Sequence, residues 1–216
     1  MFTKLWMQQD VIQVSAETTI GEAKEILSHH NFRHLPVTNG DILLGIITST
    51  DLTKAMPSPV DSQVGPEEQI IADQVKVSAF MTTNPITVSA MTPLEEVANL
   101  MRKFKIGAIP VVEESTLIGI ITETNIFEAF RAIMDGATDD VRIEMLIDKR
   151  QSAFYKVIDC CKKFEATINS ISLYGDYSSD QQLMTIRING EQSDRLLDAM
   201  WDLGVKINQV TQLAKE

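Results

Sequence analysis

The hydrophobic pattern of the chain switches between strand-like and helix-like spacing twice, in a similar order. Apolar residues stand at helical spacing after Thr19 and again after Pro93, which predicts an amphipathic helix in each place. Short β-branched and aliphatic runs lie before these helices, at 12–14 and 86–88, and two further runs follow each helix. The pattern therefore predicts strand, helix, strand, strand, helix in each half.

The two halves are copies of one another at a spacing of 74 residues. Over residues 10–55 and 84–129, 15 of 46 aligned positions are identical, where ordinary amino-acid usage gives roughly three by chance. Each copy has too few elements to cover its apolar faces, so we expect the copies to pack against each other. Trp6-Met7 and Phe80-Met81 also recur at this spacing and are expected to be core residues before the first strand of each unit.

The last third of the chain has a different pattern. Residues 141–147 alternate as in a strand, a helical face runs from Ala153 to Phe164, and strands are expected at 171–174 and 184–188. A second helix then ends near Gly204, before a last strand at 205–210. The order βαββαβ predicts a ferredoxin-like unit that pairs with a copy of itself.

Composition narrows the classes of function. The formal net charge of −11 and pI of about 4.7 repel a phosphate backbone or an anionic bilayer, so neither nucleic acid nor a membrane is an expected partner. No export signal or apolar span is apparent, and the cytoplasm is the expected compartment. Cys160 and Cys161 are adjacent in a predicted helix, where one thiol is expected to face the core and the other to point away.

The residues best suited to binding a ligand are concentrated near the end of each copy. They are Gly-Ile-Ile-Thr-Ser-Thr-Asp at 45–51 and Gly-Ile-Ile-Thr-Glu-Thr-Asn at 119–125. A buried strand that runs into hydroxyls and then an Asp or Asn at a helix start offers donors to an anion and a partner to ribose hydroxyls. Helix capping alone is the other interpretation. We find no convergent nucleophile and base, so no catalytic residue is expected, and no metal ligands are expected around His30 and His34.

These motifs resemble those of a known family. The duplicated block is similar to a tandem pair of cystathionine-β-synthase (CBS) domains, a Bateman module, through the Leu-Pro-Val and Ile-Pro-Val strands at 35–37 and 109–111 and the Gly-Ile-Ile-Thr segments. The resemblance implies two βαββα units over residues 1–138, with one repeat at about 1–56, a linker at about 57–75 and the other repeat at about 76–134. It also implies that adenine nucleotides (AMP, ADP or ATP) bind in clefts between the repeats.

The resemblance places two sites on this sequence, each joining residues of both repeats. Site one comprises Thr48, Thr50, Asp51, Ile86, Ile106, Gly107 and Ala108. Site two comprises Ile12, Phe32, Arg33, His34, Thr122, Thr124 and Asn125. Asn125 stands where the family's ribose-binding Asp is usual, while Arg33 and His34 give site two cations that Gly107 and Ala108 do not give site one. We therefore expect adenosine recognition at the Asp51 site and phosphate binding on the Arg33 side.

Residues 139–216 resemble an ACT domain in their element order, and the whole arrangement is similar to CBS-ACT regulators of the acetoin-utilization type. The stretch 148–153, which would be the ligand loop, contains no glycine. We expect an α+β, non-enzymatic regulatory homodimer in which an adenine nucleotide is the regulatory ligand and the ACT-like unit passes occupancy to a partner enzyme or transporter. Two alternatives stay open: an oligomerisation subunit with empty clefts, and an amino-acid sensor acting through the ACT-like unit.

Overall fold

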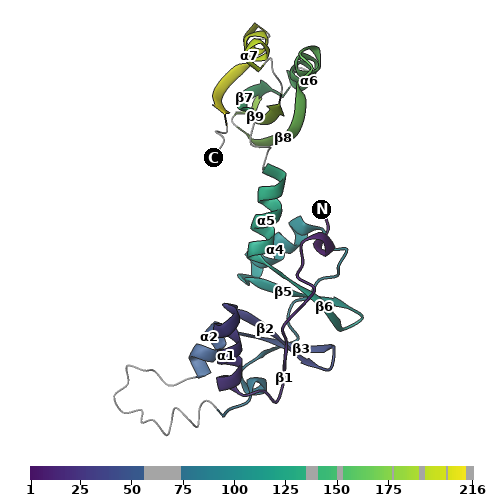
Figure 1. The fold of residues 1–216 in the computed structure, drawn as a ribbon, viewed down its shortest axis with the longest axis vertical. Coiled ribbons are helices and arrows are strands. Elements are labelled where there is room, and N and C mark those ends of the chain that lie inside the picture. The colour runs from purple at the N-terminus through teal and green to yellow at the C-terminus, as the bar shows by residue number, and fades with distance from the viewer. Residues whose placement is uncertain are drawn as a thin grey trace, which may run out of the picture. The chain divides into compact units, whose positions relative to one another are not determined.

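The computed structural model describes residues 1–55, 74–134, 141–149, 153–176, 178–189, 193–202 and 204–212. These residues form two compact units, Met1–Ala129 and Phe130–Glu216, and Figure 1 shows their elements. Nearly all of the linker expected at 57–75 lies outside the described residues.

The two repeats of the first unit have matching elements, except that β1 and β4 are not equivalent at the 74-residue spacing. In the first they are η1 (Thr3–Leu5), β1 (Val14–Ser15), α1 (Ile20–His30), β2 (His34–Asn39), β3 (Ile42–Thr48) and α2 (Ser49–Ala55). In the second they are η2 (Val77–Ala79), β4 (Thr82–Thr83), α4 (Leu94–Phe104), β5 (Ala108–Glu113), β6 (Thr116–Thr122) and α5 (Glu123–Met134). The helix starts follow local chemistry: Thr19 and Glu22 form a capping box at α1, and Pro93 is the N-cap of α4.

One sheet joins the repeats, in the order β1-β2-β3-β6-β5, with β4 on β3. Its centre is symmetric: the Leu43 amide donates to the Ser115 carbonyl at 3.1 Å, and the Leu117 amide donates to the Asp41 carbonyl at 2.8 Å. These two bonds are equivalent at the 74-residue spacing. The expected packing of one copy against the other is therefore what the unit shows.

The strand expected at 86–88 is reduced to a single parallel bridge between Val88 and Val111. Val88 donates to the Pro110 carbonyl and accepts from the Val112 amide. The next bond of this parallel ladder requires an N–H at position 110, which proline lacks. The chain therefore leaves the sheet before Val88, as it does in the first repeat, where β1 begins at Val14.

The segments before the first strands cross between the repeats. Trp6 and Met7 pack against the core of the second repeat, and Thr3, which is fully buried, donates to the Thr92 carbonyl at 2.8 Å. In the opposite direction Met81 packs against the core of the first repeat. Trp6, Met7 and Met81 therefore pack against a core as expected, in each case that of the other repeat, whereas Phe80 is 40% exposed.

Two glycines receive the crossing segments. A Cβ at Gly45 would lie 2.7 Å from the Thr82 carbonyl oxygen and 2.9 Å from Met81 Sδ. A Cβ at Gly119 would lie 2.8 Å from Met7 Sδ and 3.0 Å from the Gln8 carbonyl oxygen. The Gly of each Gly-Ile-Ile-Thr segment thus makes room for the other repeat's leading segment.

The second unit has the element order expected from the sequence pattern. Its strands and helices are β7 (Val141–Asp148), α6 (Ala153–Lys163), β8 (Thr167–Asp176), β9 (Gln181–Asn189), α7 (Ser193–Asp202) and β10 (Lys206–Gln212). The strands form an antiparallel sheet in the order β10-β7-β9-β8. Apolar residues of β7 and β9 make one core with α6 and α7.

Both cysteines lie in that core, which corrects the expectation that one of them points away. Cys160 is 6% exposed and Cys161 is fully buried, because α6 contacts α7 as well as the sheet. Burial raises the pKa of Cys161 to about 11. The thiols therefore serve packing rather than redox chemistry.

Candidate functional site

Two clefts lie between the repeats, each lined by residues of both. The first cleft, which holds site one, has a volume of about 600 Å³, and the second cleft, which holds site two, has about 270 Å³. Ligand sites of proteins usually occupy roughly 300–1,000 Å³. The first cleft falls within that range and the second lies slightly below it.

Six of the seven residues expected at site one line the first cleft. They are Thr48, Thr50, Ile86, Ile106, Gly107 and Ala108. The hydroxyl residues come from the end of β3 and the start of α2, and the apolar ones from the second repeat. Asp51 is the exception: it does not line this cleft, and the reason lies in its hydrogen bonds.

Asp51 is engaged with Thr48. Its Oδ2 accepts from the Thr48 amide at 3.0 Å and from Thr48 Oγ1 at 2.7 Å, while the Asp51 amide donates to Thr48 Oγ1 at 3.2 Å. This reciprocal arrangement closes the first turn of α2, as a capping side chain does. The capping interpretation therefore describes Asp51, whereas Thr50 beside it faces the cleft.

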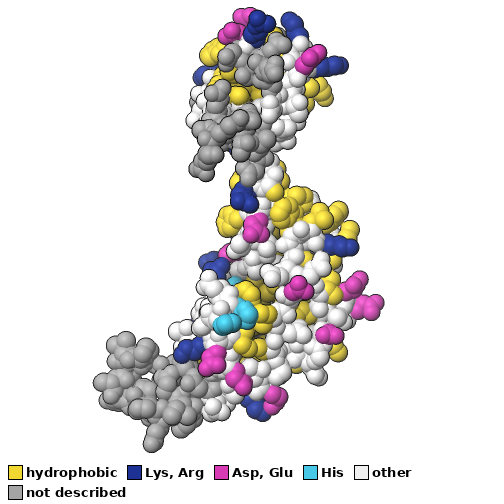
Figure 2. Space-filling model, in the orientation of Figure 1, with side chains coloured by type: hydrophobic (Ala, Val, Ile, Leu, Met, Phe, Trp, Pro, Cys, Tyr) yellow, Lys and Arg dark blue, Asp and Glu magenta, His cyan; other side chains and the backbone are white. Residues whose placement is uncertain are grey.

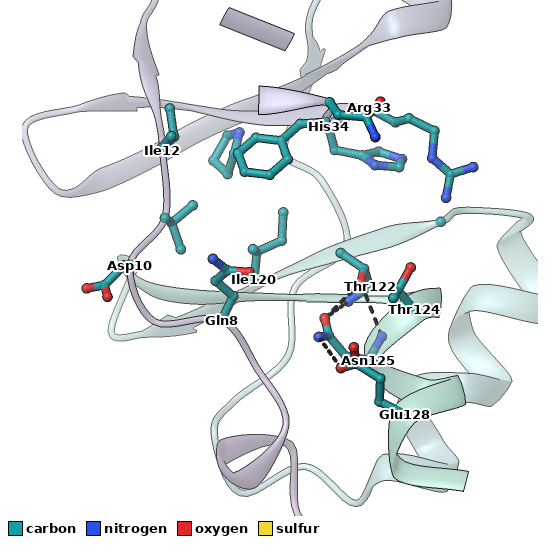
Figure 3. A pocket seen from close by; sticks show the side chains of 15 residues that line it. Gln8, Asp10, Ile12, Arg33, His34, Ile120, Thr122, Thr124, Asn125 and Glu128 are labelled. Carbon is teal, nitrogen blue, oxygen red and sulfur yellow. Dashed lines mark hydrogen bonds between the residues drawn. The ribbon is translucent and has the colours of Figure 1, made fainter. Parts of the chain in front are cut away.

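All seven residues expected at site two line the second cleft, and Figure 3 shows Arg33 and His34 on one side with Thr122, Thr124 and Asn125 opposite. Asn125 repeats the capping bonds: its Oδ1 accepts from the Thr122 amide at 2.9 Å and from Thr122 Oγ1 at 2.8 Å. Its Nδ2 lies 3.5 Å from Glu128 Oε2. Asn125 thus preserves the geometry of Asp51 and exposes a donor in place of an acceptor.

Several lining residues were missed by the sequence analysis. In the first cleft they include Thr82, Asn84, Lys105 and Glu123. In the second they include Gln8, Asp10, Asn31 and Glu128. A signal was present, because Gln8 and Thr82, Asp10 and Asn84, and Asn31 and Lys105 are equivalent at the 74-residue spacing. Gln8, Thr82, Asp10 and Asn84 could have been found from this equivalence, whereas the place of Lys105 depends on the turn that ends α4.

The first cleft has cationic lining residues, although Gly107 and Ala108 supply none. Lys105 lines it, and so do Arg33 and His34, which line both clefts. Lys105 is brought there by the end of α4, where it adopts the left-handed conformation with φ 55°. The charged residues that line only the second cleft, Asp10 and Glu128, are acidic. Phosphate is therefore better matched by the first cleft than by the second.

His34 has an altered proton affinity. Burial lowers its pKa below the ordinary 6.5, the charge of Arg33 acts in the same direction, and Glu123 and Asp51 oppose them. The imidazole is therefore mainly neutral at pH 7, where it can both donate and accept a hydrogen bond.

This pKa shift predicts a pH dependence of stability. Well above pH 6.5, His34 is neutral in both the folded and the unfolded state. As the pH falls through 6.5, the unfolded state takes up the proton first, because the pKa of His34 is lower in the folded state. The free energy of unfolding therefore falls until the pH reaches the folded pKa. We expect the melting temperature to fall further between about pH 7.5 and about pH 5.5 in the wild type than in His34→Gln. Thermal melts of both proteins test this, and parallel pH curves would contradict it.

Among the residues that the structure describes, no group of three or more His, Cys, Asp or Glu is placed to hold a metal. No helix among the same residues is long and apolar enough to cross a bilayer. On the face shown in Figure 2, Lys and Arg side chains lie scattered, with Asp and Glu distributed among them.

Two equivalent repeats that share a sheet and enclose two matched clefts define a class of tandem-repeat proteins with ligand sites at the repeat interface. The comparison with protein families agrees: the CBS domain model matches residues 3–58 and 77–132. These matches cover more than half of the chain. The chain belongs to the CBS-domain family.

Solved structures with the same fold include complexes with adenosine compounds. The CBS domain pair of protein MJ0100, in complex with 5′-methylthioadenosine and S-adenosyl-L-methionine, is 30% identical with a TM-score of 0.51, over 61% of this chain and 97% of that chain. CBSX2 in complex with AMP is 26% identical with a TM-score of 0.53, over 62% and 98%. A Vibrio cholerae protein assigned to acetoin utilization (AcuB) is 26% identical with a TM-score of 0.53, over 62% and 93%.

Among curated proteins, a CBS domain-containing protein of Dictyostelium discoideum is 29% identical over 62% of this chain and 94% of its own length. Inosine-5′-monophosphate dehydrogenase of Korarchaeum cryptofilum is 33% identical, but the match covers only 22% of that enzyme and 55% of this chain. A CBS pair therefore occurs both as nearly a whole protein and as a segment of an enzyme.

Proposed function

We propose that this chain is a non-enzymatic regulatory protein that binds adenine nucleotides in the clefts between its CBS repeats. The observation that carries the proposal is the matched pair of clefts, each lined by strand-end threonines of one repeat and by the chain at 32–34 or 106–108 of the other. The complexes of MJ0100 and CBSX2 with adenosine compounds support it. The hydroxyls of Thr50 and Thr124 would donate to a phosphate, and Arg33 and Lys105 would supply its counter-charge.

The second unit is proposed to be an ACT-like output domain of ferredoxin-like topology. Its element order and sheet order β10-β7-β9-β8 support this assignment. Within the second unit, Met134 Sδ at the end of α5 accepts from Ser172 Oγ of β8 at 3.7 Å. The stretch 148–153, expected as an amino-acid loop, lies partly outside the described residues. A homodimer, a regulated enzyme or transporter, and a cytoplasmic location stay predictions.

Thermal melting with AMP tests nucleotide binding. A ligand that binds only the folded state adds about 2.7 kcal/mol of stability at a concentration about 100-fold above its Kd, so AMP should raise the melting temperature. Thr50→Val removes a cleft hydroxyl with little change in shape and is expected to reduce the ligand-induced rise. Asp51→Ala is a poorer test, since it also removes the cap of α2.

The matched control is Thr53→Val, in the same helix. Thr53 is exposed and donates to the Ser49 carbonyl at 2.9 Å; it does not line the first cleft. Its variant should retain the full AMP-induced rise. No rise with AMP, ADP or ATP in the wild type would leave the oligomerisation alternative as the better interpretation.

A further inference from the structure

The two clefts are separated by a thin wall. Arg33, His34 and Gly107 are the residues that line both of them. At Gly107 there is little spare room: a Cβ would lie 3.2 Å from His34 Cε1 and 3.4 Å from Glu123 Oε2. A ligand on either side of this wall therefore approaches the same side chains.

The wall is built unequally by the two repeats. At the 74-residue spacing Arg33 and His34 correspond to Gly107 and Ala108, so one repeat supplies a guanidinium and an imidazole where the other supplies no polar side chain. The backbone is fixed in both, since the Ser49 amide donates to the Arg33 carbonyl and the Glu123 amide to the Gly107 carbonyl, each at 3.0 Å. The Arg33 side chain itself is exposed, so it can turn toward either cleft.

The other charged residues of the two clefts make the sharing of Arg33 unequal. Lys105 and Glu123 line the first cleft, and Asp10 and Glu128 line the second. When Arg33 turns to the first cleft, the charged side chains that remain at the second cleft are the carboxylates of Asp10 and Glu128. A phosphate entering there would meet those carboxylates, as well as the phosphate already bound across the wall.

We propose that the two clefts compete for one cation, Arg33, beside the neutral His34, so that a first nucleotide phosphate in either cleft weakens the binding of a second in the other. This inference rests on the proposed nucleotide binding and states how its two sites are coupled. The preferred doubly occupied state then holds a phosphate-bearing ligand in the first cleft and an uncharged adenosine compound in the second. By linkage the weakening factor is the same whichever cleft fills first.

Isothermal titration calorimetry with AMP and with adenosine, on the full chain, tests the coupling. We expect two AMP molecules to bind, and for each ligand we compare the Kd of the second molecule with that of the first. This ratio of the two Kd values should be about tenfold larger for AMP than for adenosine. Equal ratios for the two ligands would overturn the proposal. If neither ligand binds, the proposed function itself fails, which is a different result.

Blocking one cleft at a time separates coupling from two sites that merely differ. Ile12 and Ile86 are equivalent positions, in the second and first cleft respectively, so Ile12→Trp should leave only the first cleft open and Ile86→Trp only the second. In each background Arg33→Gln should weaken AMP binding about tenfold and leave adenosine unchanged. Weakening in only one background would show that Arg33 belongs to a single cleft and would overturn the proposal.

Lys24→Gln is the charge-matched control, because Lys24 is exposed on α1 and lines neither cleft. It should change no AMP affinity by more than the measurement error. Melting curves without ligand establish that each tryptophan variant is folded. Should either variant fail to fold, the Arg33→Gln variant of the unblocked chain still decides. The proposal requires this variant to weaken the binding of the first AMP and to bring the AMP ratio closer to that of adenosine, and an unchanged ratio would overturn it.

Discussion

Removing residues 1–9 is expected to open the core of the second repeat and to leave that of the first largely intact. The deletion takes Trp6 and Met7 away from the second core and removes the buried Thr3 with its bond to Thr92. Loss of a single methionine-sized side chain from a core costs roughly 2–5 kcal/mol. We therefore expect the free energy of unfolding of the second repeat to fall by about 4 kcal/mol or more.

Hydrogen exchange followed residue by residue measures this directly. Amides of β5 and β6 should lose protection in the truncated chain, while those of β2 and β3 should lose much less. The first repeat provides the internal control, because its core is completed by Val75, Val77 and Met81, which the deletion leaves in place. Greater loss in β2 and β3 would show that the segments do not cross.

The second large effect is expected at the glycines that face the crossing segments. Gly45→Ala and Gly119→Ala each place a methyl group within about 3 Å of a backbone carbonyl oxygen, which a flexible side chain cannot relieve by moving. Overpacking of this kind costs typically about 1–3 kcal/mol. We expect both variants to lose stability in that range, measured by chemical denaturation.

Gly107→Ala is the matched control for these substitutions. Its new methyl group would meet the end of the His34 side chain at 3.2 Å, and a side chain can give way where a backbone carbonyl cannot. Its loss of stability should therefore be clearly smaller, about 0.5 kcal/mol or less. Equal losses at all three glycines would contradict the close approach of the leading segments.

Much of this fold could be predicted because the same hydrophobic pattern occurs in both repeats. The repeated helices, the hairpin strands and the packing of one copy on the other follow from a periodicity seen at two places. The crossing could not be predicted for the same reason. Met7 and Met81 are the same residue at equivalent positions, so a leading segment offers nearly the same contacts to its own repeat and to the other, and the sequence pattern does not choose between them.

The site was predictable in its positions and less so in its charges. Thr50, Thr124 and the segments at 32–34 and 106–108 line the clefts as expected. Lys105 was missed because its place depends on the left-handed turn that ends α4, a backbone conformation unusual for lysine and not encoded by a glycine or asparagine at that position. Asp51 was expected in the cleft because its type suits ribose, but its carboxylate is held by Thr48.

The exchange of leading segments means that neither copy is a self-sufficient folding module. A chain cut within 56–73 would give two fragments, each carrying the peptide that plugs its counterpart and lacking its own. The repeat in each half should be poorly structured alone and should regain structure when the two halves are mixed. For the same reason, an ancestral gene carrying a single copy would have needed a second polypeptide of its kind, with duplication later tying the two together.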